Sequence, residues 1–390
     1  MDILTEILSS LNTQANPQFN LGTYTTTLMD NDANKIIGAL LPYNKVNRNE
    51  YPEITKMEDA CIIFLQKIIH LSNDSDSFGM STLGSSEAIL MACYALKNGY
   101  VGTEKPNMIV SDCAHSSWIS ATRLLDIELR TISLETIPLE KAILDVIDRN
   151  TIGIGLTLGT TSTGAFEPIQ DIDNILSAYE IKNEHHIPIH VDAASGGFIA
   201  PFQFPDLKWD FRLNHVCSIN ISGHKYGMVY PSIGWVFWKK KDIYTQKIKM
   251  KIDYLKNEFT HFGVNFSAPS AFIAAQYYTF IKYGYSGYVK KVKDLFRLKK
   301  LIENELKQIP SLIVLSNDNP VRLPVVCWAY HEDYMFEIIT KKFEELGWIV
   351  PCCNISRNDS SRCCRIVIRH NFREEDAMRL AGDIATVHRL

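Results

Sequence analysis

The chain has 390 residues, of which 46% are hydrophobic and 22% are charged, and its formal net charge is −4. This composition is typical of a globular protein and excludes an intrinsically disordered chain. Acidic and basic residues are mixed along the sequence, so no basic region is present to attract nucleic acid. No apolar run reaches the roughly 18–20 residues of a membrane span, and the first residues carry acids where a secretory signal has bases. We therefore expect a cytoplasmic protein that binds neither nucleic acid nor membranes.

The first 55 residues are predicted to form an N-terminal arm (residues 1–55). A short amphipathic helix is expected at residues 3–11, and a polar, turn-rich stretch with Pro17, Pro42 and Pro52 follows it. After the arm, the spacing of apolar residues predicts a helix over residues 58–69.

Helices and short apolar runs then alternate along the chain. A helix is expected to begin at the Gly-Ser-Ser-Glu of residues 84–87 and to end at Lys97. Strands are predicted at residues 107–111, 151–158, 187–191, 216–221 and 233–238. Short buried strands that alternate with helices indicate the α/β class, with a mostly parallel central sheet.

The last third of the sequence has a different character. Two helices are predicted at residues 268–282 and 286–307. They are followed by predicted strands at 312–315, 324–330 and 362–368 and by helices at 333–346 and from residue 373. We therefore predict a large domain over residues 56–284 and a small C-terminal α/β domain over residues 285–390.

The nine cysteines are an odd number and do not suggest a disulfide framework, so reduced thiols are expected. Four of them form the adjacent pairs Cys352-Cys353 and Cys363-Cys364. Zinc sites usually separate two ligands by two to four residues, and adjacent side chains on a strand face opposite sides. We therefore favour apolar packing in a strand and predict no metal site.

Polar residues follow several of the predicted strands. In open α/β sheets, ligands bind beyond the carboxyl ends of the strands. Three polar groups fall at such ends, namely residues 160–163, Asp192 and residues 222–225. A fourth group, Ser85 and Ser86, falls at the start of a predicted helix. The four segments together are the candidate ligand site.

Each of these groups has a functional and an ordinary interpretation. Lys225 lies among small residues and would become a nucleophilic amine if desolvation lowered its pKa, although many such lysines are solvated surface groups. Asp192 would pair with a protonated pyridine nitrogen, or it would merely cap a loop. Ser85 and Ser86 would present a phosphate with backbone N–H groups, or they would only cap the helix. Together the groups describe a site for pyridoxal 5′-phosphate.

Longer motifs around these residues resemble the group II pyridoxal-phosphate-dependent decarboxylases of fold type I, and most closely the glutamate decarboxylases. The motifs that carry the resemblance are residues 82–88, 190–202, 209–212, 218–227, 234–236, 265–269, 275–278 and 347–351. The similarity extends from about Asn20 to the last helix. It implies the fold of the pyridoxal-phosphate-dependent transferases, with a large domain and a small C-terminal domain.

The resemblance also implies a role for each matching residue. Lys225 would carry the cofactor as an internal aldimine, Asp192 would pair with the pyridine nitrogen, and Ala194 would pack against one ring face. Thr161 would lie near the ring hydroxyl. The phosphate would be held by Ser85, Ser86, Ser222 and His224, and by Ser267 of the partner subunit. An active site shared in this way makes a homodimer the smallest assembly.

For the substrate, the resemblance implies that Arg365 binds the α-carboxylate and that Tyr254, in a loop, supplies the proton that replaces CO2. The pocket for the distal carboxylate matches Thr23, Tyr24 and Asn44 of the arm.

Three positions depart from the glutamate decarboxylase pattern. His115 stands where those enzymes have a glutamine, and its segment resembles the aromatic amino-acid decarboxylases, in which a histidine stacks on the cofactor. Tyr24 replaces a phenylalanine, and Asn47 replaces an acidic residue that helps to hold the substrate side chain.

The implied reaction is the α-decarboxylation of an amino acid, through the Lys225 aldimine and a quinonoid intermediate. L-Glutamate, which would give 4-aminobutanoate and CO2, is the leading substrate. Another acidic or polar amino acid is an alternative, as is a carbon–carbon lyase or an oxidative deaminase of the same fold. A binding protein that kept only the fold is a third hypothesis, which the presence of Lys225, Asp192 and Arg365 disfavours.

Overall fold

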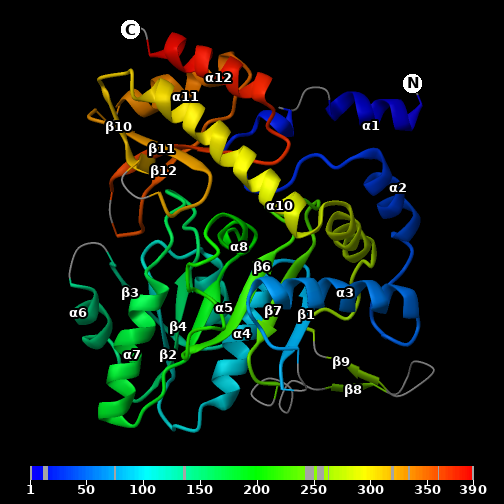
Figure 1. Cartoon of the computed structure of the whole chain (residues 1–390), viewed down its shortest axis with the longest axis vertical. Coiled ribbons are helices and arrows are strands. Elements are labelled where there is room, and N and C mark those ends of the chain that lie inside the picture. The colour runs from blue at the N-terminus through cyan, green and yellow to red at the C-terminus, as the bar shows by residue number, and fades with distance from the viewer. Residues whose placement is uncertain are drawn as a thin grey trace.

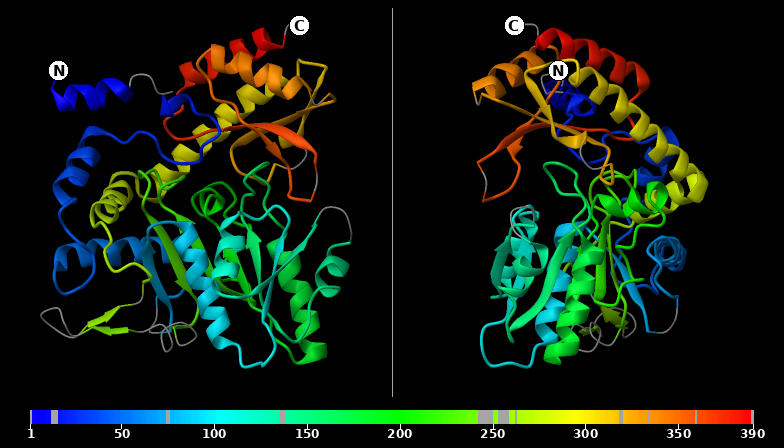
Figure 2. Two further views of the ribbon diagram at one scale, coloured as in Figure 1. Left: turned by 180° about the vertical axis from the view of Figure 1, so that it is seen from behind. Right: turned by 60° about the vertical axis from the view of Figure 1, so that its left-hand side comes forward.

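The computed structural model describes residues 2–11, 16–73, 76–134, 138–241, 250–252, 259–261, 263–317, 320–332, 334–358 and 360–388. Figure 1 shows a large sheet with helices around it and, at one end of it, a smaller sheet with its own helices. Both chain termini lie at the end of the molecule that carries the small sheet, as Figure 2 also shows. No helix among the described residues is long and apolar enough to cross a membrane.

The large sheet has seven strands in the order β1-β7-β6-β5-β4-β2-β3. The strands β2 to β6 run parallel, and β7 pairs antiparallel with both β6 and β1, so the predicted mostly parallel sheet is confirmed. Their bounds are β1 (Phe78–Thr82), β2 (Asn107–Ser111), β3 (Glu128–Ile132), β4 (Thr151–Thr157), β5 (Ile189–Asp192), β6 (Val216–Ser222) and β7 (Gly234–Trp238).

Helices cover both faces of this sheet, because its strands carry apolar side chains on both sides. On β2, Met108 and Val110 join a cluster that contains Trp118, whereas Ile109 between them joins the main core on the other side. Trp118 approaches β4 so closely that a Cβ at Gly155 would lie 2.3 Å from its ring. The covering helices are α3 (Pro52–Ile68), α4 (Ser85–Gly99), α5 (Ser117–Leu124), α6 (Leu139–Leu144), α7 (Ile169–Asn183), α8 (Ala200–Gln203) and the short η2 (Gly196–Phe198).

The small sheet has four antiparallel strands in the order β10-β11-β13-β12. They are β10 (Leu312–Val314), β11 (Val325–Tyr330), β12 (Cys352–Asn354) and β13 (Arg362–Val367), and they pack with α11 (Tyr334–Glu345), α12 (Glu374–Val387) and the short η3 (Leu315–Asn317). The vicinal cysteines lie on β12 and β13 as free thiols, with Cys352 opposite Cys364 and Cys353 opposite Cys363. The expectation that these cysteines pack in strands is confirmed, although a strand over residues 352–354 was not among those predicted from apolar runs.

The two helices predicted at residues 268–282 and 286–307 are the two helical parts of α10 (Ala271–Leu306), which meet at the non-helical Gly284. Gly284 has φ 55° and ψ −171°, a backbone conformation that is nearly restricted to glycine. The helix runs from the large sheet to the small one (Figure 1). The division into domains at residues 284 and 285 stays a prediction.

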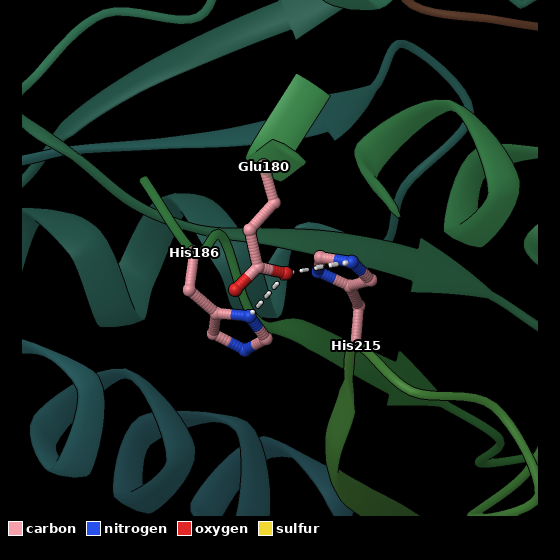
Figure 3. A group of neighbouring side chains, drawn as sticks. All are labelled: Glu180, His186 and His215. Carbon is pink, nitrogen blue, oxygen red and sulfur yellow. Dashed lines mark hydrogen bonds and ion pairs between the residues drawn. The ribbon is translucent and has the colours of Figure 1, made fainter. Parts of the chain in front are cut away.

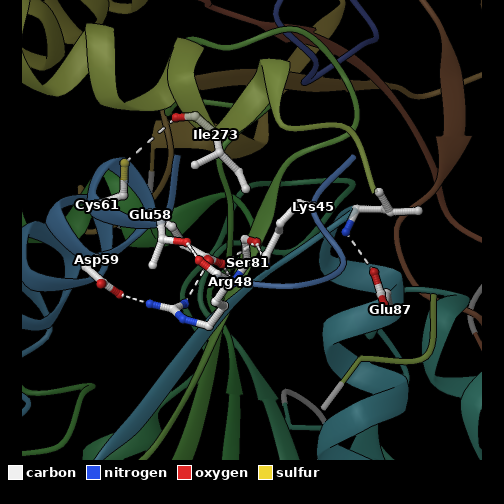
Figure 4. Close-up of polar contacts among 10 residues, drawn as sticks. Lys45, Arg48, Glu58, Asp59, Cys61, Ser81, Glu87 and Ile273 are labelled. Carbon is white, nitrogen blue, oxygen red and sulfur yellow. Dashed lines mark hydrogen bonds and ion pairs between the residues drawn. The ribbon is translucent and has the colours of Figure 1, made fainter. Parts of the chain in front are cut away.

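The N-terminal arm begins with α1 (Ile3–Leu11), η1 (Pro17–Phe19) and α2 (Asn31–Leu40). Between the last two, the chain lies against the small sheet, where Leu21 N–H donates to Ile349 and Val367 N–H donates to Leu21. Further along, Lys45 and Arg48 pair with the buried carboxylate of Glu58 on α3, as Figure 4 shows.

Several elements were not predicted from the sequence, namely β1, β3, β12, α2, α5, α6, α7 and the small hairpin of β8 (Met250–Ile252) and β9 (Phe259–His261). The burial pattern of β3 explains one omission, because Glu128 and Thr131 are exposed and only Ile132 is fully buried. An edge strand of this kind lacks the apolar run by which the other strands were found.

Candidate active site

A cavity of about 350 Å³ opens at the carboxyl ends of β4, β5 and β6, next to the first turn of α4. It is lined by Leu83, Gly84, Ser85, Ser86, Glu87, Ile89, His115, Ser117, Thr157, Gly159, Thr161, Asp192, Ala194, Ser195, Ser222, His224, Lys225 and Asn265. All four segments singled out in the sequence therefore contribute to one site. The volume lies in the range typical of small-molecule sites.

A second cavity, of about 370 Å³, lies between the arm and β1. Its charged groups are satisfied by one another, since Glu58 accepts from Lys45 Nζ at 2.5 Å and from Arg48 Nη1 at 2.9 Å. Ser81 also donates to Glu58 through its backbone N–H and its hydroxyl (Figure 4). We interpret this cluster as the attachment of the arm, not as a reactive site.

Lys225 follows β6 and points into the first cavity. Its Nζ lies 3.2 Å from Ser195 Oγ and 5.4 Å from the centre of the Tyr24 ring. Burial lowers the pKa of Lys225, and the cation of Arg365 lowers it further, whereas the Asp192 carboxylate opposes both effects. A lysine with a lowered pKa supplies the uncharged amine that nucleophilic chemistry requires.

Asp192 ends β5 and is only 3% exposed. Its Oδ1 accepts hydrogen bonds from Ala194 N–H at 3.1 Å and from Asn220 Nδ2 at 2.9 Å. Asn220 lies opposite Asp192 on the neighbouring parallel strand β6. The carboxylate is thus held by two donors while it lines the cavity.

The contacts of Asn220 continue into the sheet. Because its amide NH₂ donates to Asp192, its Oδ1 faces His190 Nε2 at 2.7 Å, so that nitrogen carries the proton. The other ring nitrogen of His190 then accepts from Ser218 Oγ at 2.7 Å. Burial lowers the pKa of His190 to about 4, which keeps this imidazole neutral. The chain of four polar residues fixes the orientation of Asp192.

The start of α4 forms the opposite wall of the cavity. Ser85 Oγ lies 2.7 Å from Ser222 Oγ, and Ser86 Oγ lies 2.9 Å from Ser117 Oγ. A Cβ at Gly84 would lie 2.9 Å from Cε1 of His224, so only glycine lets the helix begin against this ring.

His224 has an unmet hydrogen-bonding group at this wall. Its Nδ1 is buried and has no hydrogen-bond partner within the described part of the chain. Burial, together with the charge of Lys225, lowers the pKa of His224 to about 4. Hydroxyls, a helix N-terminus and an unpartnered ring nitrogen together fit a phosphate group.

His115 lies between β2 and α5 and lines the same cavity. Its Nδ1 accepts from Ser117 N–H at 3.1 Å and lies 2.6 Å from Ser117 Oγ, which orients the ring. Removal from water lowers the pKa of His115; Lys225 and Arg357 add to this, while Asp192 counteracts it. A neutral, oriented ring at this position can cover a flat ligand.

Three distant segments meet at Arg365 on β13. Its guanidinium donates to the carbonyl of Thr161 and, at 3.0 Å, to the carbonyl of Gly22, while its Nε is buried without a partner among the described residues. Tyr24 OH donates to the same Thr161 carbonyl at 2.9 Å, and the Tyr24 ring centre lies 5.4 Å from the guanidinium carbon. Thr23 lies beside Tyr24, where its Oγ1 is 2.7 Å from Thr25 Oγ1.

Some of the predicted site residues do not line the cavity of their own chain. Asn44 Nδ2 donates to Ser267 Oγ at 3.2 Å, and Asn47 Oδ1 accepts from Asn49 N–H at 2.9 Å. The predicted residues that are absent from the lining of the cavity are Thr23, Tyr24, Asn44, Asn47, Ser267 and Arg365. Tyr254 lies outside the described residues.

The structure adds residues that sequence reasoning missed, namely Ser117, His190, Ser195, Asn220 and Asn265. His190 and Asn220 did carry a signal, because polar residues in strands that are otherwise apolar are rarely buried without a purpose. Ser195 and Asn265 carried no such signal apart from the motifs in which they lie, because no local pattern in the sequence indicates which side chains meet in the fold.

The arrangement of these residues defines a class of protein. A mostly parallel seven-stranded sheet carries a buried lysine, a fixed aspartate and an anion-binding helix start around one cavity. This is the layout of the pyridoxal-phosphate-dependent enzymes of fold type I. The unpartnered Nδ1 of His224 and the low pKa of Lys225 both fit that cofactor.

Comparisons with known proteins agree with this class. Residues 1–331 match the family described as the pyridoxal-dependent decarboxylase conserved domain. A glutamate decarboxylase of Solanum lycopersicum is 34% identical over 95% of this chain and 77% of its own length. A glutamate decarboxylase of Lactococcus lactis is 32% identical over 95% of this chain and 83% of its own length.

A solved structure of a Lactobacillus brevis glutamate decarboxylase superposes with a TM-score of 0.91 at 30% identity, over 98% of this chain and 90% of that one. A sphingosine-1-phosphate lyase of Burkholderia pseudomallei, at 20% identity and a TM-score of 0.83, shares the fold; the match covers 99% of this chain and 90% of that chain. The chain belongs to the pyridoxal-dependent decarboxylase family. It is a carboxy-lyase, and its cofactor is pyridoxal phosphate.

Proposed function

We propose that the protein removes the α-carboxyl group of L-glutamate and forms 4-aminobutanoate and CO2. The observation that carries the proposal is the convergence of Lys225 and Asp192 on one cavity, in a chain that is 34% identical to a glutamate decarboxylase. The identity of the substrate side chain is inferred from the relatives, because no described residue of the cavity is specific for a second carboxylate. Another acidic or polar amino acid is the alternative.

The bound cofactor supplies an acceptor for the electrons that are released when a bond to the α-carbon breaks. Lys225 would provide the amine that holds the cofactor. Asp192, fixed by Asn220 and Ala194, would stabilise a positive charge on the pyridine nitrogen. His115 would cover one face of the ring and Ala194 the other.

The phosphate of the cofactor is proposed to bind Ser85, Ser86, Ser222 and His224, with Thr161 near the ring hydroxyl. Arg365 is proposed to bind the α-carboxylate of the substrate, and its unpartnered Nε is one of the donors left for this purpose. Thr23 and Tyr24 would then face the substrate from the arm. Tyr254 is the proposed proton donor to the α-carbon.

We further propose a homodimer in the cytoplasm, with active sites that both chains complete. Asn44 and Ser267 support this proposal, because they lie outside the cavity of their own chain, whereas Asn47 is buried within its own chain. Asn44 and Ser267 are also exposed and contact each other, so both can serve the cavity of a neighbouring copy.

The test is CO2 release by the protein loaded with pyridoxal phosphate, measured across a panel of amino acids. Lys225→Ala is the blank, and Lys239→Ala, which also changes a lysine whose pKa burial lowers, is the matched control. We expect release from glutamate in the native protein and the control, and none in the blank. If CO2 were released only from a different amino acid, glutamate would be refuted as the substrate, and the proposed α-decarboxylation would stand. No release from any amino acid, with the cofactor bound, would refute the proposed reaction.

A further inference from the structure

Two histidines and a glutamate converge at the end of the large sheet that lies opposite the cofactor cavity. Glu180 lies in the last turn of α7, His186 follows in the loop before β5, and His215 directly precedes β6. Asp192 and Ser222, which belong to the cavity, lie at the other ends of these two strands. The three residues therefore form a separate group, shown in Figure 3.

The spacing of their polar atoms fits a metal ion. Glu180 Oε2 lies 3.1 Å from His186 Nδ1 and 3.5 Å from His215 Nε2, and the three ligand atoms all lie within 4.8 Å of one another. Ligand atoms that are about 2.0–2.2 Å from a tetrahedral zinc ion are about 3.3–3.6 Å from one another. In Figure 3 one carboxylate oxygen of Glu180 faces a ring nitrogen of each histidine, and the two rings stack with their centres 4.6 Å apart.

The surroundings of His215 prepare it as a ligand. The side chain is 1% exposed, and its Nδ1 lies 2.9 Å from the carbonyl of Ile187, to which it must donate a proton. A second hydrogen bond of this kind fixes the tautomer of metal-binding histidines and leaves Nε2 as the ligand atom. That Nε2 faces a carboxylate oxygen at 3.5 Å, so either a proton on Nε2 or a metal ion between the two atoms must separate these acceptors.

The position of Glu180 adds a second reason. The carbonyl groups at the C-terminus of a helix favour a cation and disfavour an acid. Glu180 lies within this last turn of α7, and it is 41% exposed, as is His186 at 50%, so an ion can reach the group from solvent. A divalent cation would neutralise the acid and complement the end of the helix.

We propose that Glu180, His186 and His215 bind a zinc ion, with water completing the coordination. Two imidazoles and one carboxylate are a ligand set typical of zinc. The ion would connect the end of α7 to the segments that lead into β5 and β6. The group lies at the ends of β5 and β6 opposite the cofactor cavity, so the proposal does not depend on the proposed reaction.

The experiment uses the untagged full chain with its cofactor, stripped of metal with a chelator and then titrated with ZnCl₂. The variants are Glu180→Gln and His186→Gln, which change partly exposed side chains and leave the buried His215 in place. His185→Gln is the matched control, because it removes the neighbouring histidine outside the group. Bound zinc per chain, the dissociation constant and the melting temperature are measured for each protein.

We expect one zinc ion per chain in the native protein and in the His185→Gln control, with an increase in melting temperature. The Glu180→Gln and His186→Gln variants should bind zinc at least about tenfold more weakly and show no increase. Co²⁺ bound to the native protein should lack the charge-transfer absorption of cobalt on thiolate. Equal zinc binding in all four proteins, no zinc binding at all, or a thiolate spectrum would overturn the proposal.

Discussion

Asn220 is predicted to control catalysis without touching the substrate, because it holds the Asp192 carboxylate. The amide donates to Asp192 Oδ1 at 2.9 Å, and the side chain is fully buried, so water cannot replace this contact. A hydrogen bond to a charged group contributes about 1.5–3 kcal/mol. If this orients Asp192 toward the ring nitrogen, Asn220→Ala should lower kcat/KM by about 10- to 150-fold.

Two further variants separate this role from a loss of packing. Asn220→Asp keeps the shape and the acceptor for His190, but it places a second carboxylate beside Asp192, so we expect it to be worse than Asn220→Ala. Ser218→Ala removes only the far end of the chain, at His190 Nδ1, and should change activity by a few-fold at most. The readouts are kcat/KM for CO2 release, the affinity for the cofactor, and the pH dependence of the absorbance of the bound cofactor.

We therefore expect kcat/KM to fall least in Ser218→Ala, more in Asn220→Ala and most in Asn220→Asp. The reasoning would be refuted by an Asn220→Asp variant with the native affinity, absorbance and kcat/KM. It would also be refuted if all three variants lost activity only in proportion to their loss of thermal stability.

Two predictions concern stability. Burial raises the pKa of Glu167 from 4.5 to about 7. The folded chain therefore binds this proton more tightly than the unfolded chain does. As a result, the free energy of unfolding should fall by up to about 3 kcal/mol as pH rises from about 4.5 through about 7. Glu167→Gln should abolish this slope, and parallel melting-temperature curves for the two proteins between pH 5 and 8 would contradict the prediction. Gly284→Ala should cost about 1–3 kcal/mol through the backbone alone, because no atom lies within 4 Å of the added Cβ. Gly38→Ala, also with open space but within helix α2, is the control and should not destabilise in thermal unfolding.

The sequence by itself determined the buried strands of the central sheet and pointed to the residues that are proposed to react. Apolar runs predicted β2 at its observed bounds and β4, β6 and β7 within one residue at each end. Lys225, Asp192 and the Ser85-Ser86 pair were found because they directly follow or begin such elements. This works because hydrophobic periodicity and helix ends are encoded by residues close together in the chain.

The tertiary structure alone decided which polar groups meet. Asp192 and Asn220 become neighbours only because β5 and β6 pair in parallel with these two residues in register. The group of Glu180, His186 and His215 likewise has no ligand spacing that the sequence could reveal, and no metal site was predicted from it.

The same holds for the arm. Tyr24 reaches Thr161 through a contact that spans 137 positions in the chain. Contacts of this kind depend on strand order and on the packing of whole elements, and both are set by the burial of the complete core. No short stretch of the sequence contains that information, so the partners of the reactive groups became known only with the fold.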